Sequence, residues 1–328
     1  MNALTSTLAV VVIGRNEGER LRRCFASVAR PGSPVVYVDS GSTDGSVALA
    51  RELQVDVVEL DPKQPFTAAR ARNAGWRRVQ QLVPDATFVQ FVDGDCEMLA
   101  NWLDIAHRHL HTHPGVAALA GRLRERFPDA SIYNRLCDIE WDTPVGEAKA
   151  VGGIAMLRIA ALAAVGGFRE NLIAGEEPEL CVRLRAAGWK VWRLPIDMAW
   201  HDAAMTRFSQ WWRRTERSGF AFAEGAHLHG KPPERHWVHQ SRSAWGWGLA
   251  LPAVILLLLS LFGPKALLLL LAYPAQMLRL FLREPGPAKT RAARAFFMVV
   301  GKFPEALGQL RFMLRRWRRA PVRLIEYK

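Results

Sequence analysis

Cysteine is scarce in this chain of 328 residues. The four cysteines stand far apart and none forms a C-x-x-C pair, which excludes the clustered ligands of a structural zinc site. Four scattered thiols are also too few for a disulfide-built secreted scaffold. The N-terminal segment lacks the early positive charge of a secretory leader, and its first apolar run stops at Arg15-Asn16-Glu17. We therefore expect four reduced thiols in a cytosolic compartment.

Two common phosphate-binding motifs are missing. No G-x-G-x-x-G follows the first apolar run, and no G-x-x-x-x-G-K-[ST] occurs. The usual dinucleotide and P-loop sites are therefore excluded.

The charge of the chain is unevenly distributed. Half of the residues are hydrophobic and 23% are charged, which is typical of a folded globular protein. The formal net charge is +13, yet residues 279–328 hold 13 Lys and Arg against 3 Asp and Glu and so contribute +10 of it. The preference for an anionic partner therefore belongs to the C-terminal part, and the rest of the chain is nearly balanced.

The first third of the chain alternates between two hydrophobic patterns. Short runs rich in Val, Ile and Phe are separated by stretches with helical spacing. This alternation predicts an α/β fold with a doubly wound, mixed or mostly parallel sheet. The expected strands cover residues 8–13, 35–38, 55–60 and 87–92, and the expected helices cover 19–29, 46–53 and 68–83.

Polar side chains follow three of these expected strands. They are Arg15-Asn16-Glu17, Asp39 and Asp93-Gly94-Asp95. Ligands of such sheets bind beyond the carboxyl ends of the strands. Two carboxylates one residue apart are suited to Mg²⁺ or Mn²⁺, which take oxygen ligands and leave room for phosphates. The plainer interpretation of the D-x-D tripeptide is an ordinary turn.

A long apolar region without acidic residues lies between Arg235 and Arg283. Residues 244–262 carry no charge and would reach about 28 Å as a helix, close to the thickness of a hydrocarbon core. A second apolar segment, 266–282, follows Gly263-Pro264-Lys265. Positive charge on both outer flanks favours a transmembrane hairpin with both ends cytoplasmic. The alternative is a buried helical hairpin of a soluble domain.

The C-terminal tail has the pattern of a basic amphipathic helix. Its apolar residues recur every three or four positions, and five arginines lie mostly elsewhere on the helix. We expect this helix to lie on anionic lipid rather than to bind nucleic acid, because few aromatic side chains interrupt the basic run. The apolar positions are Phe303, Leu307, Leu310, Leu314 and Trp317, and the arginines are 311, 315, 316, 318 and 319.

Six segments occur together in an order that resembles glycosyltransferase family 2. They are VVIGRNEGERLRRCFASV, YVDSGSTDGS, ARNAG, FVDGD, GGIAMLR and GEEPELCVRLRAAGWKV, and they span about residues 8–201. The resemblance implies a GT-A fold and an enzyme that transfers a sugar, with inversion, from a nucleotide-diphosphate sugar donor. The implied cofactor is Mg²⁺ or Mn²⁺.

The resemblance also implies roles for individual residues. Asp95 would coordinate the metal on the diphosphate, and Asp93 would face ribose or metal. The other implied donor contacts are Arg15 and Glu17 after the first strand, Asp39 and Asp44 around the second strand end, and Arg72 and Asn73 of A-R-N-A-G.

The catalytic base is expected in the G-E-E-P-E segment. The family usually has Glu-Asp here with the Asp as base, whereas this chain has Glu176-Glu177. Glu177 occupies the Asp position, but the longer side chain leaves the choice between Glu177 and Glu176 open; both carboxylates also complement the dipole of the following helix. His201 is a further candidate metal or phosphate ligand, or else a core histidine.

These observations predict a metal-dependent inverting glycosyltransferase of cell-envelope, polysaccharide or glycolipid synthesis. Its acceptor would be a saccharide or lipid-linked molecule. The alternatives are a polyprenyl-phosphate sugar synthase and a non-catalytic membrane scaffold with the same fold. The expected domains are a catalytic domain at 1–225, a linker at 226–243, a transmembrane hairpin at 244–283 and an interfacial tail at 284–328, which together place the protein as a multi-pass protein in the cytoplasmic membrane.

Overall fold

The computed structural model describes residues 8–318. The chain divides into two compact units after Ala204. The first unit is a mixed α/β domain, and the second consists of helices.

One nine-stranded sheet organises the first unit, with the order β3-β2-β1-β4-β8-β6-β9-β5 and with β7 paired to β9. The strands β3, β2, β1 and β4 are parallel to one another, whereas β8 runs antiparallel to both β4 and β6. The expected parallel sheet of β1 to β4 is therefore present. The remaining strands extend it with both parallel and antiparallel pairings. The strands are β1 (Leu8–Gly14), β2 (Val35–Asp39), β3 (Asp56–Glu59), β4 (Phe88–Asp93), β5 (Cys96–Met98), β6 (Val116–Glu125), β7 (Gly146–Glu147), β8 (Ala155–Arg158) and β9 (Lys190–His201).

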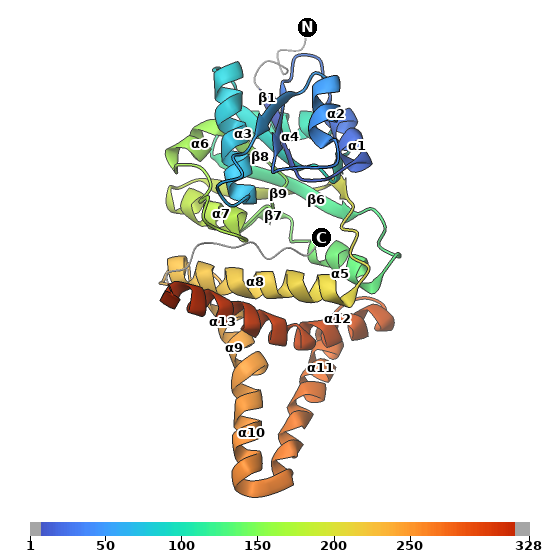
Figure 1. Ribbon diagram of the computed structural model, residues 1–328, viewed down its shortest axis with the longest axis vertical. Coiled ribbons are helices and arrows are strands. Elements are labelled where there is room, and N and C mark those ends of the chain that lie inside the picture. Colours follow the sequence, from blue (N-terminus) through green and yellow to red (C-terminus); the bar gives the residue numbers. More distant parts are fainter. Residues whose placement is uncertain (1–7, 319–328) are drawn as a thin grey trace. The chain divides into compact units, whose positions relative to one another are not determined.

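Helices pack around this sheet, as Figure 1 shows for α3 on one side of the strands and for α1 and α2 on the other. The strand β1 is buried along almost its whole length because it lies between two parallel neighbours and beneath α3. Gly75 of α3 permits this close packing, since a Cβ there would lie 2.2 Å from a methyl group of Val11. The helices are α1 (Glu19–Val28), α2 (Ser46–Glu52), α3 (Ala68–Leu82), α4 (Trp102–Thr112), α5 (Ile132–Glu140), α6 (Ile159–Ala164) and α7 (Glu176–Ala186).

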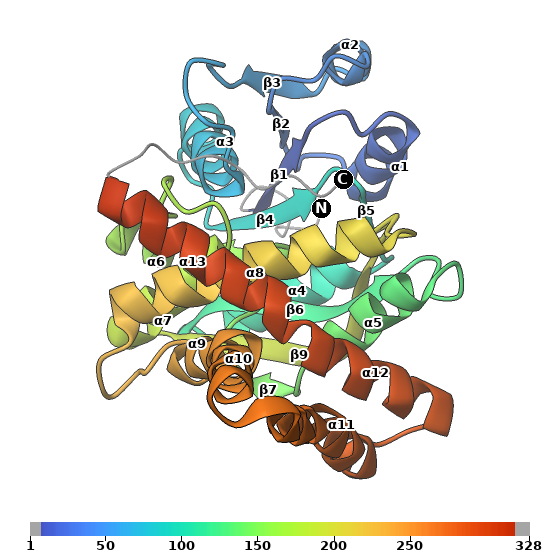
Figure 2. The same ribbon diagram turned by 60° about the horizontal axis from the view of Figure 1, so that its bottom comes forward.

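In the second unit, α8 (Phe208–His229) packs along α13 (Lys302–Arg318), as Figure 2 shows. Glycines make this contact possible: a Cβ at Gly308 would lie 2.0 Å from the carbonyl oxygen of Glu216. Residues 205–225 therefore fall in the second compact unit. The boundary at 225 expected for the catalytic domain stays a prediction. The expected linker, 226–243, contains the end of α8 and most of α9 (Val238–Trp245).

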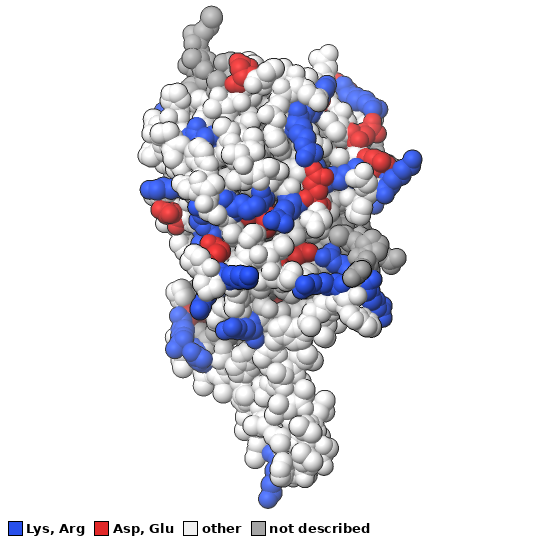
Figure 3. Space-filling view, turned by 90° about the vertical axis from the view of Figure 1, so that its left-hand side faces the viewer, with Lys and Arg blue, Asp and Glu red and all other residues white. Residues whose placement is uncertain are grey.

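The apolar region forms two arms that are joined by a turn (Figure 1). One arm comprises a π-helical turn (Gly246–Ala250) and α10 (Leu251–Phe262), and the other comprises a 3-10 segment (Gly263–Leu271) and α11 (Ala272–Arg283). The chain reverses at Gly263, whose φ of 70° is unfavourable for other residues. Figure 3 shows that few charged side chains cover these arms.

Length and composition qualify one segment of the described chain, Val238–Arg283, as a candidate membrane span. This is weak evidence for membrane association and gives no support for the expected multi-pass placement. Within the most apolar stretch of the segment, only 11% of the residues are buried. A soluble core helix would be mostly buried, so the alternative of a buried hairpin is not favoured.

The tail contains two helices, α12 (Ala288–Val300) and α13. The predicted apolar face of α13 remains largely exposed: Leu310 is 40% exposed and Trp317 is 80% exposed. The opposite face, which includes Gly308, Gln309 and Phe312, is buried instead. Of the five arginines of the predicted basic helix, Arg311 and Arg315 form ion pairs with the buried carboxylates of α8, Glu216 and Glu224. Arg319 lies outside the described residues.

Candidate active site

The carboxyl ends of three adjacent strands meet at one rim of the sheet. Gly14 of β1 is opposite Asp39 of β2, and Ile13 of β1 is opposite Asp93 of β4. The three polar strand ends that the sequence singled out therefore lie side by side. This is the edge at which doubly wound sheets bind ligands.

Hydrogen bonds hold the first two loops of this rim together. The backbone N–H of Asn16 donates to Ser42 Oγ at 2.9 Å, and the amide oxygen of Asn16 accepts from the backbone N–H of Thr43 at 2.7 Å. Asp44 accepts from the backbone N–H of Gly18 at 3.0 Å and from the hydroxyl of Ser46 at 2.6 Å. Partial burial acts to raise the pKa of Asp44, but these hydrogen bonds outweigh it and hold the pKa below its ordinary value. Asp44 thus fixes the loop after β1.

Asp39 is buried at the end of β2 and is 2% exposed. Its carboxylate accepts from the Tyr37 hydroxyl at 2.9 Å and from the backbone N–H groups of Gly41 and Ser42 at 2.8 Å each. Asp39 therefore shapes the turn after β2.

The two remaining predicted contacts of the first loop differ in exposure. Arg15 is exposed, and its guanidinium lies 5.7 Å from the ring centre of Phe66. Glu17 lies beside Gly94 of the D-G-D turn, where a Cβ would come within 3.1 Å of its side chain, and it pairs with Arg20 at 2.9 Å. Glu17 therefore connects the loop after β1 with the turn after β4.

Arg72, at the start of α3, is 3% exposed and lies between two carboxylates. It donates to Asp93 Oδ1 at 2.9 Å and to Glu176 Oε1 at 2.6 Å. Burial acts to lower the pKa of Arg72, but the two carboxylates raise it above its ordinary value, so the side chain stays charged. This one side chain connects the end of β4 with the start of α7.

Asn73 is buried and hydrogen-bonded to the segment before α7. It is 1% exposed, and its side-chain amide donates to the carbonyl of Phe168 and to Glu170, both at 2.8 Å. Its amide oxygen accepts from the backbone N–H of Phe168 and from the indole of Trp76. The donor contact expected at Asn73 stays a prediction; in the structure this amide holds the segment before α7.

Asp95 and His201 form a candidate metal centre. His201 Nε2 lies 3.2 Å from Asp95 Oδ2, and Cys96 donates to Asp95 Oδ1 at 3.5 Å. Ligand atoms of Asp95, Cys96 and His201 lie within 4.8 Å of one another, the only such group among residues 8–318. Burial raises the pKa of Cys96 well above its ordinary value, so the thiol is a poor ligand. A buried carboxylate with an imidazole fits Mn²⁺, and the carboxylate alone fits Mg²⁺.

Glu125 borders this centre and gave no signal in the sequence. It is 1% exposed and lies opposite His201 in the pairing of β6 with β9. It accepts from the backbone N–H groups of Phe127 and Ala203 and from the amide of Asn134. Burial raises the pKa of Glu125. The side chain of Glu125 thereby holds the backbone segment that follows His201.

The two glutamates at the start of α7 have different surroundings. Glu176 pairs with Arg72, as described above. Glu177 is 4% exposed, and its Oε1 accepts from the backbone N–H of Val151 and from the thiol of Cys181, both at 2.8 Å. Burial raises the pKa of Glu177 to about 6, although hydrogen bonds from Cys181 and the backbone of Val151 and Gly152 oppose the rise. A carboxylate with this pKa is suited to act as a general base near neutral pH.

Two family models match the chain. The first, glycosyl transferase family 2, matches residues 9–145, and the second, glycosyl transferase family group 2, matches residues 89–282. The second covers more than half of the chain. The chain belongs to glycosyltransferase family 2.

The curated relatives of this family 2 glycosyltransferase are longer than the region they share with it, so this chain spans only part of each. The pre-mycofactocin glycosyltransferase of Mycobacterium tuberculosis is 29% identical over 60% of this chain, which spans 42% of that protein. The succinoglycan biosynthesis protein ExoA of Rhizobium meliloti is 28% identical over 58% of this chain and 61% of its own. A protein named probable cytosol aminopeptidase from Polaromonas is 26% identical, but the match covers 43% of that protein, and a minority of a chain need not be the part that its name describes.

A solved structure confirms the fold of the family. The mannosyltransferase PcManGT from Pyrobaculum calidifontis, in complex with GDP-Man and Mn²⁺, superimposes with a TM-score of 0.64 at 20% identity, covering 93% of this chain and 87% of its own. The predicted mixed α/β fold of the GT-A type is therefore confirmed.

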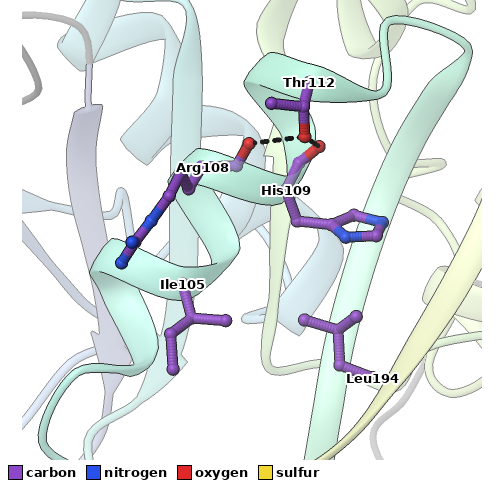
Figure 4. A pocket seen from close by; sticks show the side chains of 5 residues that line it. All are labelled: Ile105, Arg108, His109, Thr112 and Leu194. Carbon is purple, nitrogen blue, oxygen red and sulfur yellow. Dashed lines mark hydrogen bonds between the residues drawn. The ribbon is translucent and has the colours of Figure 1, made fainter.

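One surface hollow of this glycosyltransferase lies outside the candidate site. Ile105, Arg108, His109 and Thr112 of α4 line it together with Leu194 of β9 (Figure 4). The hydroxyl of Thr112 donates hydrogen bonds to the carbonyl groups of Arg108 and His109. None of the predicted site residues lines this hollow.

Proposed function

We propose that this family 2 glycosyltransferase transfers a sugar from a nucleotide-diphosphate sugar to an acceptor hydroxyl, with inversion and with the help of Mg²⁺ or Mn²⁺. The observation that carries the proposal is the bridge through Arg72. It links Asp93, two residues before the candidate metal ligand Asp95, to the start of α7, where the buried Glu177 lies. The ion pairs of Arg72 thereby hold the rim residues suited to donor binding close to the start of α7, which carries the group suited to base catalysis.

The donor would lie across the rim of strand ends. Arg15, Glu17 and Asp39 border the position of the nucleotide, with Asp44 fixing the loop, and Asp95 and His201 would hold the metal. The bound metal would neutralise the charge that develops on the departing nucleoside diphosphate. PcManGT, whose structure contains GDP-Man and Mn²⁺, supports this assignment by its fold.

The acceptor would be activated by Glu177. Its carboxylate takes the proton of the acceptor hydroxyl as the oxygen attacks the anomeric carbon, and displacement from the opposite side inverts that carbon. Glu176 is less suited because it is already paired with a guanidinium. If the acceptor were a lipid-linked phosphate, little base catalysis would be needed, and substitution of Glu177 would have little effect on turnover.

We further propose that the apolar arms associate with the cytoplasmic membrane. Exposed leucines support this, among them Leu256 at 66% and Leu268 at 66% exposure. The exposed apolar face of α13 would then lie on the lipid surface. The similarity to ExoA, named for succinoglycan biosynthesis, supports a role in polysaccharide or other cell-envelope synthesis.

The direct test is donor recognition by the full-length protein in detergent. UDP-glucose, UDP-N-acetylglucosamine and GDP-mannose are added with Mn²⁺ or with EDTA, and thermal stabilisation and donor hydrolysis are measured. We expect at least one donor to stabilise the protein and to be hydrolysed only with the metal. Absence of metal-dependent binding and hydrolysis throughout the panel would favour the non-catalytic scaffold.

A further inference from the structure

Three charged side chains meet at the rim, and two of them, Arg72 and Glu176, are largely buried while Asp93 is 37% exposed. The guanidinium of Arg72 contacts Asp93 with one terminal nitrogen and Glu176 with the other. The side chain of Glu176 is 12% exposed, and that of Arg72 is 3% exposed. A buried pair of this kind is held strongly, because removal of one partner leaves an uncompensated charge.

The chain leaves space for this guanidinium at one position. A Cβ on Gly153, in the segment before β8, would lie 2.4 Å from Arg72 Nη2. Any larger residue at this position would therefore push the guanidinium away from its two carboxylates. The neighbouring residues Val151 and Gly152 contribute the backbone N–H groups that face Glu177. The same short segment thus accommodates Arg72 and supports Glu177.

The two adjacent glutamates consequently differ in what they can do. Glu176 is bound by Arg72, and a proton on its carboxylate would disrupt that ion pair. The carboxylate of Glu177 instead accepts hydrogen bonds from groups that carry no formal charge, namely the backbone N–H groups of Val151 and Gly152 and the Cys181 thiol. The charge of Arg72 reaches Glu177 through space, without a hydrogen bond between the two side chains in the described residues. A carboxylate without a cationic partner is the better proton acceptor.

We propose that Arg72 is a positioning residue that assigns the base role to Glu177: it binds Glu176 and connects the start of α7 to Asp93. The proposal rests on the transferase function proposed above. Arg72 then has two separable effects. Its contact with Asp93 supports donor binding, and its contact with Glu176 compensates part of the negative charge that Glu176 exerts on Glu177.

The test uses full-length protein in detergent and whichever donor of the UDP-glucose, UDP-N-acetylglucosamine and GDP-mannose panel is hydrolysed fastest. Glu177→Gln should lower kcat by roughly 10²–10⁴-fold, as expected for loss of a general base. Glu176→Gln should lower kcat by only about tenfold or less, since it loses a pairing contact and not the base. The reverse order would overturn the proposal.

Arg72→Met should raise the donor KM and also lower kcat. It should shift the acidic limb of the kcat–pH profile to higher pH, because Glu176 then acts on Glu177 without a compensating charge. In Arg72→Met/Glu176→Gln the pH profile and kcat should recover while the donor KM stays high. If the double variant recovers neither, Arg72 does not act through Glu176.

A milder variant covers the case in which Arg72→Met does not fold. Gly153→Ala displaces the guanidinium but keeps every charge, and it should raise KM and shift the pH profile in the same directions. Gly115→Ala is the matched control, because no atom lies within 4 Å of its Cβ. Unchanged kinetics in Gly153→Ala would count against the proposal.

Failure of this proposal is distinguishable from failure of the proposed function. If wild-type protein hydrolyses no donor, the function fails, but the coupling of Arg72 to Glu176 is still measured from the melting temperatures of the two single variants and the double variant. Losses that are clearly less than additive support the pairing. Additive losses would overturn the positioning role.

Discussion

Replacing Glu177 with Gln should stabilise the protein at neutral pH while it removes turnover. The substitution keeps the size of the side chain and an oxygen that accepts from Val151 and Cys181. It removes the negative charge that burial disfavours. Gain of stability together with loss of activity is expected where a catalytic group is held in an unfavourable environment.

The size and the pH range follow from the pKa of Glu177, which burial raises from 4.5 to about 6. Because the folded state holds this proton more tightly than the unfolded state, ionisation costs stability. Below about pH 4.5 Glu177 is protonated in both states and does not lower the free energy of unfolding. As the pH rises to about 6 the unfolded state releases the proton first, and the folded state loses stability. The full cost at pH 7 is about 2 kcal/mol, at 1.36 kcal/mol for each unit of pKa. For a unit of about 200 residues this corresponds to roughly 4–8 °C in melting temperature.

The assay is thermal unfolding of both proteins from pH 4 to pH 8. The stability difference between Glu177→Gln and wild type should increase by about 2 kcal/mol across the titration and stay constant above it. Glu179→Gln is the matched control, because Glu179 is 1% exposed and pairs with Arg183 and Arg169. It should lose roughly 3 kcal/mol, since it breaks a buried ion pair. A difference between Glu177→Gln and wild type that does not change with pH would refute the reasoning.

Three further predictions concern the metal, the helix packing and the membrane. Asp95→Asn should weaken Mn²⁺-dependent nucleotide binding by about 10–100-fold in calorimetry. The control Asp129→Asn, at an exposed carboxylate, should leave this binding unchanged. Wild-type nucleotide affinity in Asp95→Asn would contradict the metal assignment. Gly308→Ala should lose about 1–3 kcal/mol of stability because its Cβ meets the backbone of α8. The control Gly246→Ala has open space around its Cβ, so its stability should be unchanged or higher by up to about 1 kcal/mol. Equal changes in the free energy of unfolding of the two variants would contradict the packing of α8 on α13. The full-length protein should stay in the membrane fraction after a high-salt wash and leave it with detergent, and a chain ending at Ala204 should be soluble and still bind the donor; release by salt alone would show that the apolar arms pack against protein.

Much of the first unit could be predicted from the sequence because its signals are local. The strand that begins at Leu8 is an unbroken apolar run ended by polar residues, and the structure has β1 at Leu8–Gly14. Similar runs located β2 and β4, so the common rim follows from topology alone. The later strands were harder to predict, because β8 and β6 pair antiparallel across a long separation in the chain.

The details of the site depend on contacts that no local pattern records. A-R-N-A-G indicated two donor contacts, yet Arg72 pairs with two carboxylates and Asn73 is bonded to the segment around Phe168. Glu125 gave no signal because its role depends on the register of β6 against β9. The choice between Glu176 and Glu177 likewise depends on which of them Arg72 reaches.

The net charge of the tail overstates the charge that it can offer to a membrane. Arg311 and Arg315 are engaged by Glu216 and Glu224, which lie almost a hundred residues earlier in the chain. Each basic residue near an anionic surface contributes only about 1 kcal/mol, and salt screens that contribution. Leu310, Met313 and Trp317 remain exposed on the same helix. Apolar contact, rather than the arginines that dominate the composition, should therefore decide how firmly this helix is held at a lipid surface.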